Sequence, residues 1–100
     1  MKILFIGSVK FSSEILKIII SMNSNVIGVC TKKISPFNSD FYDLSSIAKD
    51  NNIPFNYVKN INSDKNINWI KNLDPDIIFC FGWSSLIKKE LLNLLVLMKI

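Results

Sequence analysis

Apolar and polar residues along this chain follow two alternating patterns. Short, mostly apolar segments are typical of strands buried on both faces of a sheet, and they span residues 2–7, 25–31, 53–58 and 74–82. Between them, apolar residues recur at a helical spacing, as at Ile15, Ile18, Ile19 and Met22. Further helices are expected at residues 43–51, 61–73 and 84–95.

This alternation of strands with helices predicts the fold class. Repeated strand–helix–strand units form parallel sheets with right-handed crossovers. We therefore expect an α/β fold with a Rossmann-like parallel sheet, three layers (α-β-α) and about four strands, which is incomplete. Asp43 is the expected N-cap of the second helix, and Asn62 or Ser63 that of the third. Residues 32–42 are expected to form a loop.

Composition narrows the class of protein. The 100 residues suit one small domain, and 49% hydrophobic with 20% charged residues is a globular balance. The net charge of +4 comes from scattered lysines without any arginine, which disfavours a nucleic-acid partner. Cys30 and Cys80 lack metal spacing and are expected to be buried free thiols. We expect a cytoplasmic protein, because no apolar run is long enough for a signal peptide or a transmembrane segment.

Ligands of such sheets bind beyond the carboxyl ends of the strands. The candidate loops are "GSVKF", "TKKIS" and "FGWSS", which follow the first, second and fourth predicted strands. The glycine pattern and acidic residue of a dinucleotide site are missing, and so is a phosphate-binding P-loop. The chain has no histidine, so neither a hydrolytic triad nor a metal site is predicted.

Two interpretations of the fourth loop remain open from the pattern. Gly82 allows a tight turn or close approach to a flat ligand, and Trp83 is either a packed core residue or the aromatic wall of a pocket. In the second case Leu86 and Ile87 would add an apolar floor. The pattern by itself favours packing.

A family resemblance favours the pocket. The order "KILFIGSVKFSSEIL", "VIGVCT", "NNIPF" and "DPDIIFCFGWSSLIKKELL" resembles the amino-terminal part of folate-dependent formyltransferases, a family that acts on methionyl-tRNA or on amino-sugar nucleotides. The most specific pieces are the first loop, with Gly7, Ser8 and Phe11, and the fourth strand with its loop. The resemblance identifies residues 1–100 as a single partial formyltransferase amino-terminal domain.

The resemblance also implies a cofactor and a substrate. The formyl donor is 10-formyltetrahydrofolate, and its pterin would be bordered by Phe81, Gly82, Trp83, Leu86 and Ile87. The first loop, with Gly7, Ser8 and Phe11, would lie near the acceptor. The tRNA enzymes usually have a proline in that loop, whereas "GSVKF" does not. Since the chain also has no arginine, we expect an amino-sugar nucleotide acceptor rather than tRNA. Trp83 is then expected to be partly exposed at the carboxyl edge of the sheet, near Ser8.

The family's catalytic asparagine, histidine and aspartate cannot be assigned to any residue of this chain. We therefore expect an inactive fragment. The alternative is a non-catalytic binding or interaction module with the same fold. Residues 91–100 have apolar side chains on nearly every side of the helix expected there. Two explanations stay open: a truncated or frameshifted product of a longer gene, or a short protein whose tail contacts a partner or a membrane surface. Self-association through this tail or an exposed sheet edge is also expected.

Overall fold

The computed structural model describes residues 1–35, 39–83 and 96–99, the last of these as backbone. They form one five-stranded parallel sheet with the order β3-β2-β1-β4-β5. Its strands are β1 (Ile3–Ile6), β2 (Val26–Thr31), β3 (Phe55–Tyr57), β4 (Ile77–Cys80) and β5 (Val96–Lys99). The described helices are α1 (Lys10–Ser21), α2 (Ser45–Asp50) and α3 (Asp64–Leu73).

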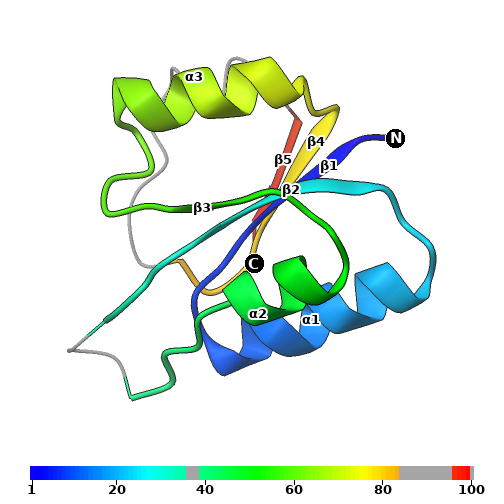
Figure 1. Cartoon of the computed structure of the whole chain (residues 1–100), viewed down its shortest axis with the longest axis vertical. Coiled ribbons are helices and arrows are strands. Elements are labelled where there is room, and N and C mark those ends of the chain that lie inside the picture. Colours follow the sequence, from blue (N-terminus) through cyan, green and yellow to red (C-terminus); the bar gives the residue numbers. More distant parts are fainter. Residues whose placement is uncertain (36–38, 84–95, 100) are drawn as a thin grey trace.

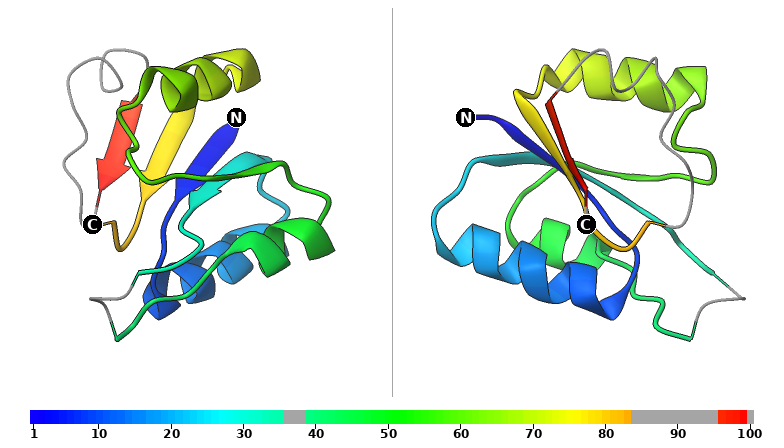
Figure 2. Two further views of the ribbon diagram at one scale, coloured as in Figure 1. Left: turned by 60° about the vertical axis from the view of Figure 1, so that its left-hand side comes forward. Right: turned by 180° about the vertical axis from the view of Figure 1, so that it is seen from behind.

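The helices lie on both faces of the sheet (Figure 1). Helices α1 and α2 cover one face and α3 covers the other, as all three ribbon views show (Figures 1 and 2). This arrangement confirms the predicted three-layer, Rossmann-like α/β fold. The order of the strands reverses between β1 and β4, because the chain leaves β3 at one edge and returns through α3 to the other side of β1.

The expectation for the end of the chain was wrong. Residues 96–99, which were expected to continue a helix, form β5 and pair in parallel with β4, with Val96 opposite Ile77. An apolar run of this kind has no periodicity that distinguishes a strand from a buried helix. Residues 96–99 form a strand because they can pair with the open edge of β4. β4 is consequently interior, and the outer strands of the described sheet are β3 and β5. The helix predicted at residues 84–95 lies outside the described residues.

Local hydrogen bonds explain where two of the helices begin. Ser63 is the N-cap of α3, as predicted, and its Oγ accepts a hydrogen bond from the backbone N–H of Asn66 at 3.2 Å. For α2 the N-cap is Leu44 rather than Asp43. The Asp43 carboxylate still accepts from the backbone N–H of Ser45 at 2.8 Å, so the expected acceptor is present one residue earlier.

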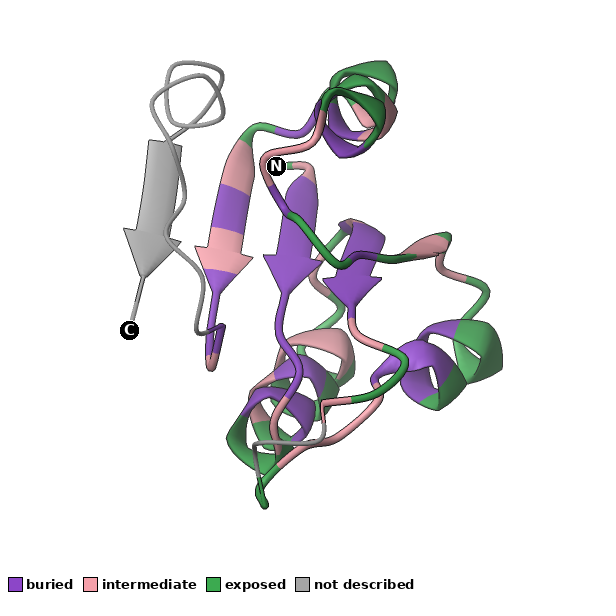
Figure 3. Ribbon diagram, turned by 90° about the vertical axis from the view of Figure 1, so that its left-hand side faces the viewer, coloured by how far each residue is buried: buried purple, intermediate pink, exposed green. Residues whose placement is uncertain are grey.

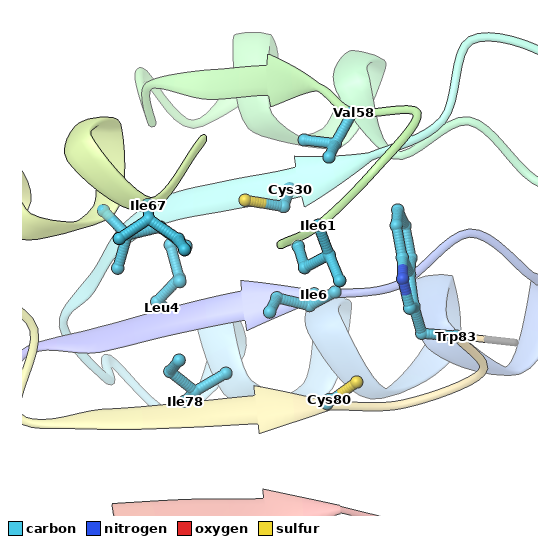
Figure 4. Close-up of a cluster of buried hydrophobic side chains, with 10 residues drawn as sticks. Leu4, Ile6, Cys30, Val58, Ile61, Ile67, Ile78, Cys80 and Trp83 are labelled. Atoms are coloured by element: carbon cyan, nitrogen blue, oxygen red, sulfur yellow. The ribbon is translucent and has the colours of Figure 1, made fainter. Parts of the chain in front are cut away.

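The core consists of two apolar clusters, one on each face of the sheet. β1 is buried along its whole length (Figure 3). The side chains of Leu4, Phe5 and Ile6 alternate between the two clusters. Leu4 and Ile6 pack on the α3 side with Ile67 and Ile70, whereas Phe5 packs on the α1 side. Ten side chains of the α3 side are drawn in Figure 4. Because its side chains point alternately to the two faces of the sheet, β1 contributes to both apolar clusters.

Cys30 and Cys80 are buried thiols on the α3 side and form no disulfide among the described residues, as predicted. The Cys30 thiol donates to Asn66 Oδ1 at 3.7 Å, and the Asn66 amide donates to the Ile61 carbonyl at 2.8 Å. Burial raises the pKa of Cys30 well above its ordinary value, the neighbouring Cys80 raises it further, and the hydrogen bond with Asn66 opposes both. Cys30 is therefore not suited to act as a nucleophile.

No described helix has both the length and the apolar character that crossing a membrane would require.

Candidate functional site

Two loops that are far apart in the sequence meet at the carboxyl edge of the sheet. Because β1 and β4 are neighbouring strands, the loops that follow them leave the sheet side by side. The backbone N–H of Phe81 donates to the Ile6 carbonyl at 2.9 Å, and that of Gly7 donates to the Cys30 carbonyl at 3.1 Å. The crossover at this edge is where open α/β sheets bind ligands.

Serine side chains join the two loops. Ser12 Oγ accepts from the backbone N–H of Val9 at 3.3 Å and donates to the carbonyl of Phe81. Ser8 Oγ donates to the carbonyl of Gly82 at 3.4 Å. Both serines are buried, so their hydroxyl groups hold the loops together. The structure therefore brings Ser8 of the first loop next to Gly82 of the fourth loop.

Gly7 and Gly82 must be glycines because neighbouring side chains of the same chain leave no room for a Cβ atom. Gly82 has φ +68°, a left-handed conformation, and a Cβ atom there would lie 2.1 Å from Cγ2 of Val9. A Cβ atom on Gly7 would lie 2.5 Å from Cβ of Ser12. The tight turn predicted at Gly82 is confirmed. Close approach of a ligand to its backbone stays a prediction.

The predicted partial exposure of Trp83 was wrong. The side chain is only 6% exposed, and it packs in the α3-side cluster with Ile61 and Val58. Figure 4 shows the indole beyond the ends of β1 and β4, turned toward these two residues. The sequence could not show this contact, because it depends on how the segment after β3 folds back over the sheet edge.

Trp83 nevertheless has two features that an ordinary core tryptophan lacks. Its indole Nε1–H is buried and has no hydrogen-bond partner among the described residues, although buried donors are nearly always paired. The Lys32 ammonium lies 4.8 Å from the centroid of the ring. A cation over an indole face is attracted by the negative face of the ring. The site therefore offers one buried donor that no described residue pairs, and one aromatic face that a lysine occupies.

Phe81 and Phe11 have different surroundings. Phe81 is buried, stacks on Phe5 with 5.6 Å between ring centroids, and contacts Phe79 edge-on at 6.1 Å. Phe11 is 53% exposed and reaches Phe81 only at 6.2 Å. Phe11 lines a hollow of about 450 Å³ together with Val9, Lys10, Glu14 and Asp40. Phe11 is thus the accessible aromatic side chain of the first loop, whereas Phe81 supports the fold.

Leu86 and Ile87, the other two candidates, lie outside the described residues.

The sequence analysis missed a second hollow at the same edge. It is lined by residues 32–35 after β2 and residues 57–59 at the end of β3, and we call it the β2–β3 pocket. Only the loops after the first, second and fourth strands were considered as sites. Had the rule for carboxyl ends also been applied to the third strand, it would have drawn attention to Lys59.

Several known proteins are similar in sequence to nearly the whole of this chain. The chain is 25% identical over 103 residues to the methionyl-tRNA formyltransferase of Thermotoga maritima. It is 32% identical over 99 residues to that of Buchnera aphidicola and 29% identical over 98 residues to that of Clostridioides difficile. Each match covers 94% of this chain but only 31–32% of the relative. No protein-family model matches the sequence. The similarities confirm the resemblance that the sequence motifs indicated.

Proposed function

We propose, from its resemblance to the amino-terminal part of the formyltransferase family, that this chain is the donor-binding part of an enzyme that moves a formyl group from 10-formyltetrahydrofolate to an amine. The chain spans about a third of the length of the curated relatives it matches, and the activity of a whole protein is part of the proposal. The observation that carries it is the direct contact between the "GSVKF" and "FGW" loops, the two most family-like stretches, at the ligand-binding edge.

On the donor side, Trp83 and Gly82 would border the pterin. The indole N–H supports this role, because it has no partner in the described part of the chain and a heterocycle or a carbonyl of the donor would supply an acceptor. A flat ligand can reach the indole face only if the Lys32 side chain moves from it. Phe81 would hold the loop from behind, since its ring is buried against Phe5.

On the acceptor side, the proposal departs from the expectation of an amino-sugar nucleotide. The relatives described above are named methionyl-tRNA formyltransferases, and this outweighs the missing proline of "GSVKF" and the lack of arginine. We therefore favour methionyl-tRNA as the acceptor, which makes RNA rather than a sugar nucleotide the partner. Phe11, exposed on the first loop beside Gly7 and Ser8, would face this acceptor. A cytoplasmic location belongs to the same proposal.

We propose no catalytic role for any residue of this chain. In the transfer, the acceptor amine attacks the formyl carbon, the carbonyl oxygen becomes negatively charged, and the amine loses a proton. The chain contains no histidine, and the buried Ser8 and Ser12 hydroxyl groups are engaged in hydrogen bonds between loops. We propose that this chain binds the donor without transferring its formyl group.

One observation favours a second candidate function. Trp83 is as buried as an ordinary core residue, which suits a binding module whose "FGW" loop is purely structural. Such a module would not bind folate at all. The two candidates therefore differ in folate binding.

The test is a titration of the purified chain with 5-formyltetrahydrofolate, a stable analogue of the donor, in a Trp69→Phe background. Binding should change the fluorescence of Trp83, the remaining tryptophan, and calorimetry should give the same dissociation constant. Phe11→Ala is the matched control, because Phe11 belongs to the same edge but to the acceptor side. If calorimetry detects no binding at millimolar ligand, the proposed function is wrong and the module is favoured.

A further inference from the structure

The β2–β3 pocket is a cationic hollow of about 380 Å³. Three of its lining residues are the lysines Lys32, Lys33 and Lys59, and none of the described residues that line it is acidic. The Asp43 carboxylate contacts one lining residue, since its Oδ2 accepts a hydrogen bond from the Tyr57 hydroxyl at 2.9 Å. A pocket with this charge favours an anion, because lysine ammonium groups donate hydrogen bonds to carboxylate or phosphate oxygens.

The pocket also has apolar walls. Val58 is buried at its base, and Ile34 is 75% exposed at its rim. Tyr57 forms part of the lining, and its hydroxyl is held within 2.8 Å of Ser45 Oγ. A ligand that fits should therefore combine a flat or apolar portion with a negatively charged end.

Two residues connect this pocket to the candidate donor site. Lys32 lines the pocket, and its ammonium lies 4.8 Å from the centroid of the Trp83 ring. Val58 lines the pocket from one side and belongs to the same core cluster as Trp83 (Figure 4). One ligand could thus contact the indole at one end and the lysines at the other.

We propose that the β2–β3 pocket binds the glutamate tail of the folate donor; this inference rests on the proposed function. A folate has a pterin at one end and a glutamate with two carboxylates at the other, separated by an aminobenzoyl ring. With the pterin beside Trp83, the aminobenzoyl ring would pass Lys32 and lie on Val58 and Ile34. The carboxylates would then meet Lys33 and Lys59. Each additional glutamate of a longer tail adds one carboxylate.

The test compares three ligands by calorimetry on the full chain at low salt: 6-hydroxymethylpterin, which has no tail, folic acid and pteroyltriglutamate. Affinity should rise along this series, and added salt should reduce the rise. Lys33→Gln and Lys59→Gln should each lower the ratio of triglutamate to hydroxymethylpterin affinity about threefold, the size expected for an exposed ion pair. Lys32 is a poor choice, because its replacement would also alter the surroundings of Trp83.

Lys17→Gln is the matched control. It makes the same change of net charge on the exposed side of α1 and should leave the ratio unchanged. Equal affinity for all three ligands would overturn the inference and leave the proposed function standing. Failure of all three to bind would overturn both. Binding of tripolyphosphate that depends on Lys59, without any gain from the glutamate tail, would show a general anion site and also overturn the inference.

Discussion

Replacing Trp83 by alanine distinguishes a packed tryptophan from an open pocket wall. A buried tryptophan removes about 150–250 Å² from water. At about 25 cal/mol per Å², burial of all but 6% of this side chain contributes about 5 kcal/mol. Measured truncations of large core residues cost about 3–5 kcal/mol, and we expect Trp83→Ala to fall in that range. A domain of this size has about 5–15 kcal/mol of stability in total, so the variant would be close to unfolding.

Trp83→Phe keeps the experiment informative if the alanine variant does not fold. Phenylalanine keeps an aromatic ring but lacks the Nε1–H, which has no hydrogen-bond partner among the described residues. An unpaired buried donor lowers the free energy of unfolding by about 1–3 kcal/mol. The loss of packing and the removal of this donor oppose each other, so we expect a change of at most about 1 kcal/mol.

Urea unfolding followed by far-UV circular dichroism measures both variants without relying on tryptophan fluorescence. Trp69→Ala is a suitable comparison, because Trp69 is only partly buried against the same cluster and should cost less. Iodide should quench Trp83 weakly in a Trp69→Phe background. A loss below about 1 kcal/mol for Trp83→Ala, together with strong quenching, would mean that the indole is open in solution and that its burial has been misjudged.

Two further predictions concern the loops and the thiol. Gly82→Ala should cost at least about 2 kcal/mol in urea unfolding, because alanine is strained at φ +68° and its Cβ meets Val9; Val9→Ala should recover part of the loss, and additive effects of the two changes would contradict the contact. Because burial raises the pKa of Cys30, the thiol of the native protein keeps its proton at a pH where the unfolded chain's thiol ionises. The free energy of unfolding should therefore be unaffected by this group below about pH 8.5 and should fall by up to about 1.4 kcal/mol per pH unit above it. The slope should be smaller in Cys30→Ala, and an identical slope in both proteins would be evidence against this cause.

The sequence by itself determined the class of fold. Continuous apolar runs such as residues 2–7 are recognisable because a strand covered on both faces needs apolar residues at every position. Helical spacing and the cap at Ser63 located α3, since both depend on residues within a few positions of each other. The family resemblance added the expectation that Trp83 lies near Ser8 at the carboxyl edge of the sheet, and the loops that carry these residues do meet there.

Only the tertiary structure decided what surrounds each side chain at that edge. The burial of Trp83 depends on Val58 and Ile61, which follow β3 in the chain and reach the indole only when the sheet is formed. The strand at residues 96–99 exists because β4 offers it a pairing edge, and an apolar run without a period cannot reveal that. The β2–β3 pocket brings Lys33 and Lys59 together across adjacent strands. Contacts between distant residues depend on strand order and crossover, which local patterns of polarity do not encode.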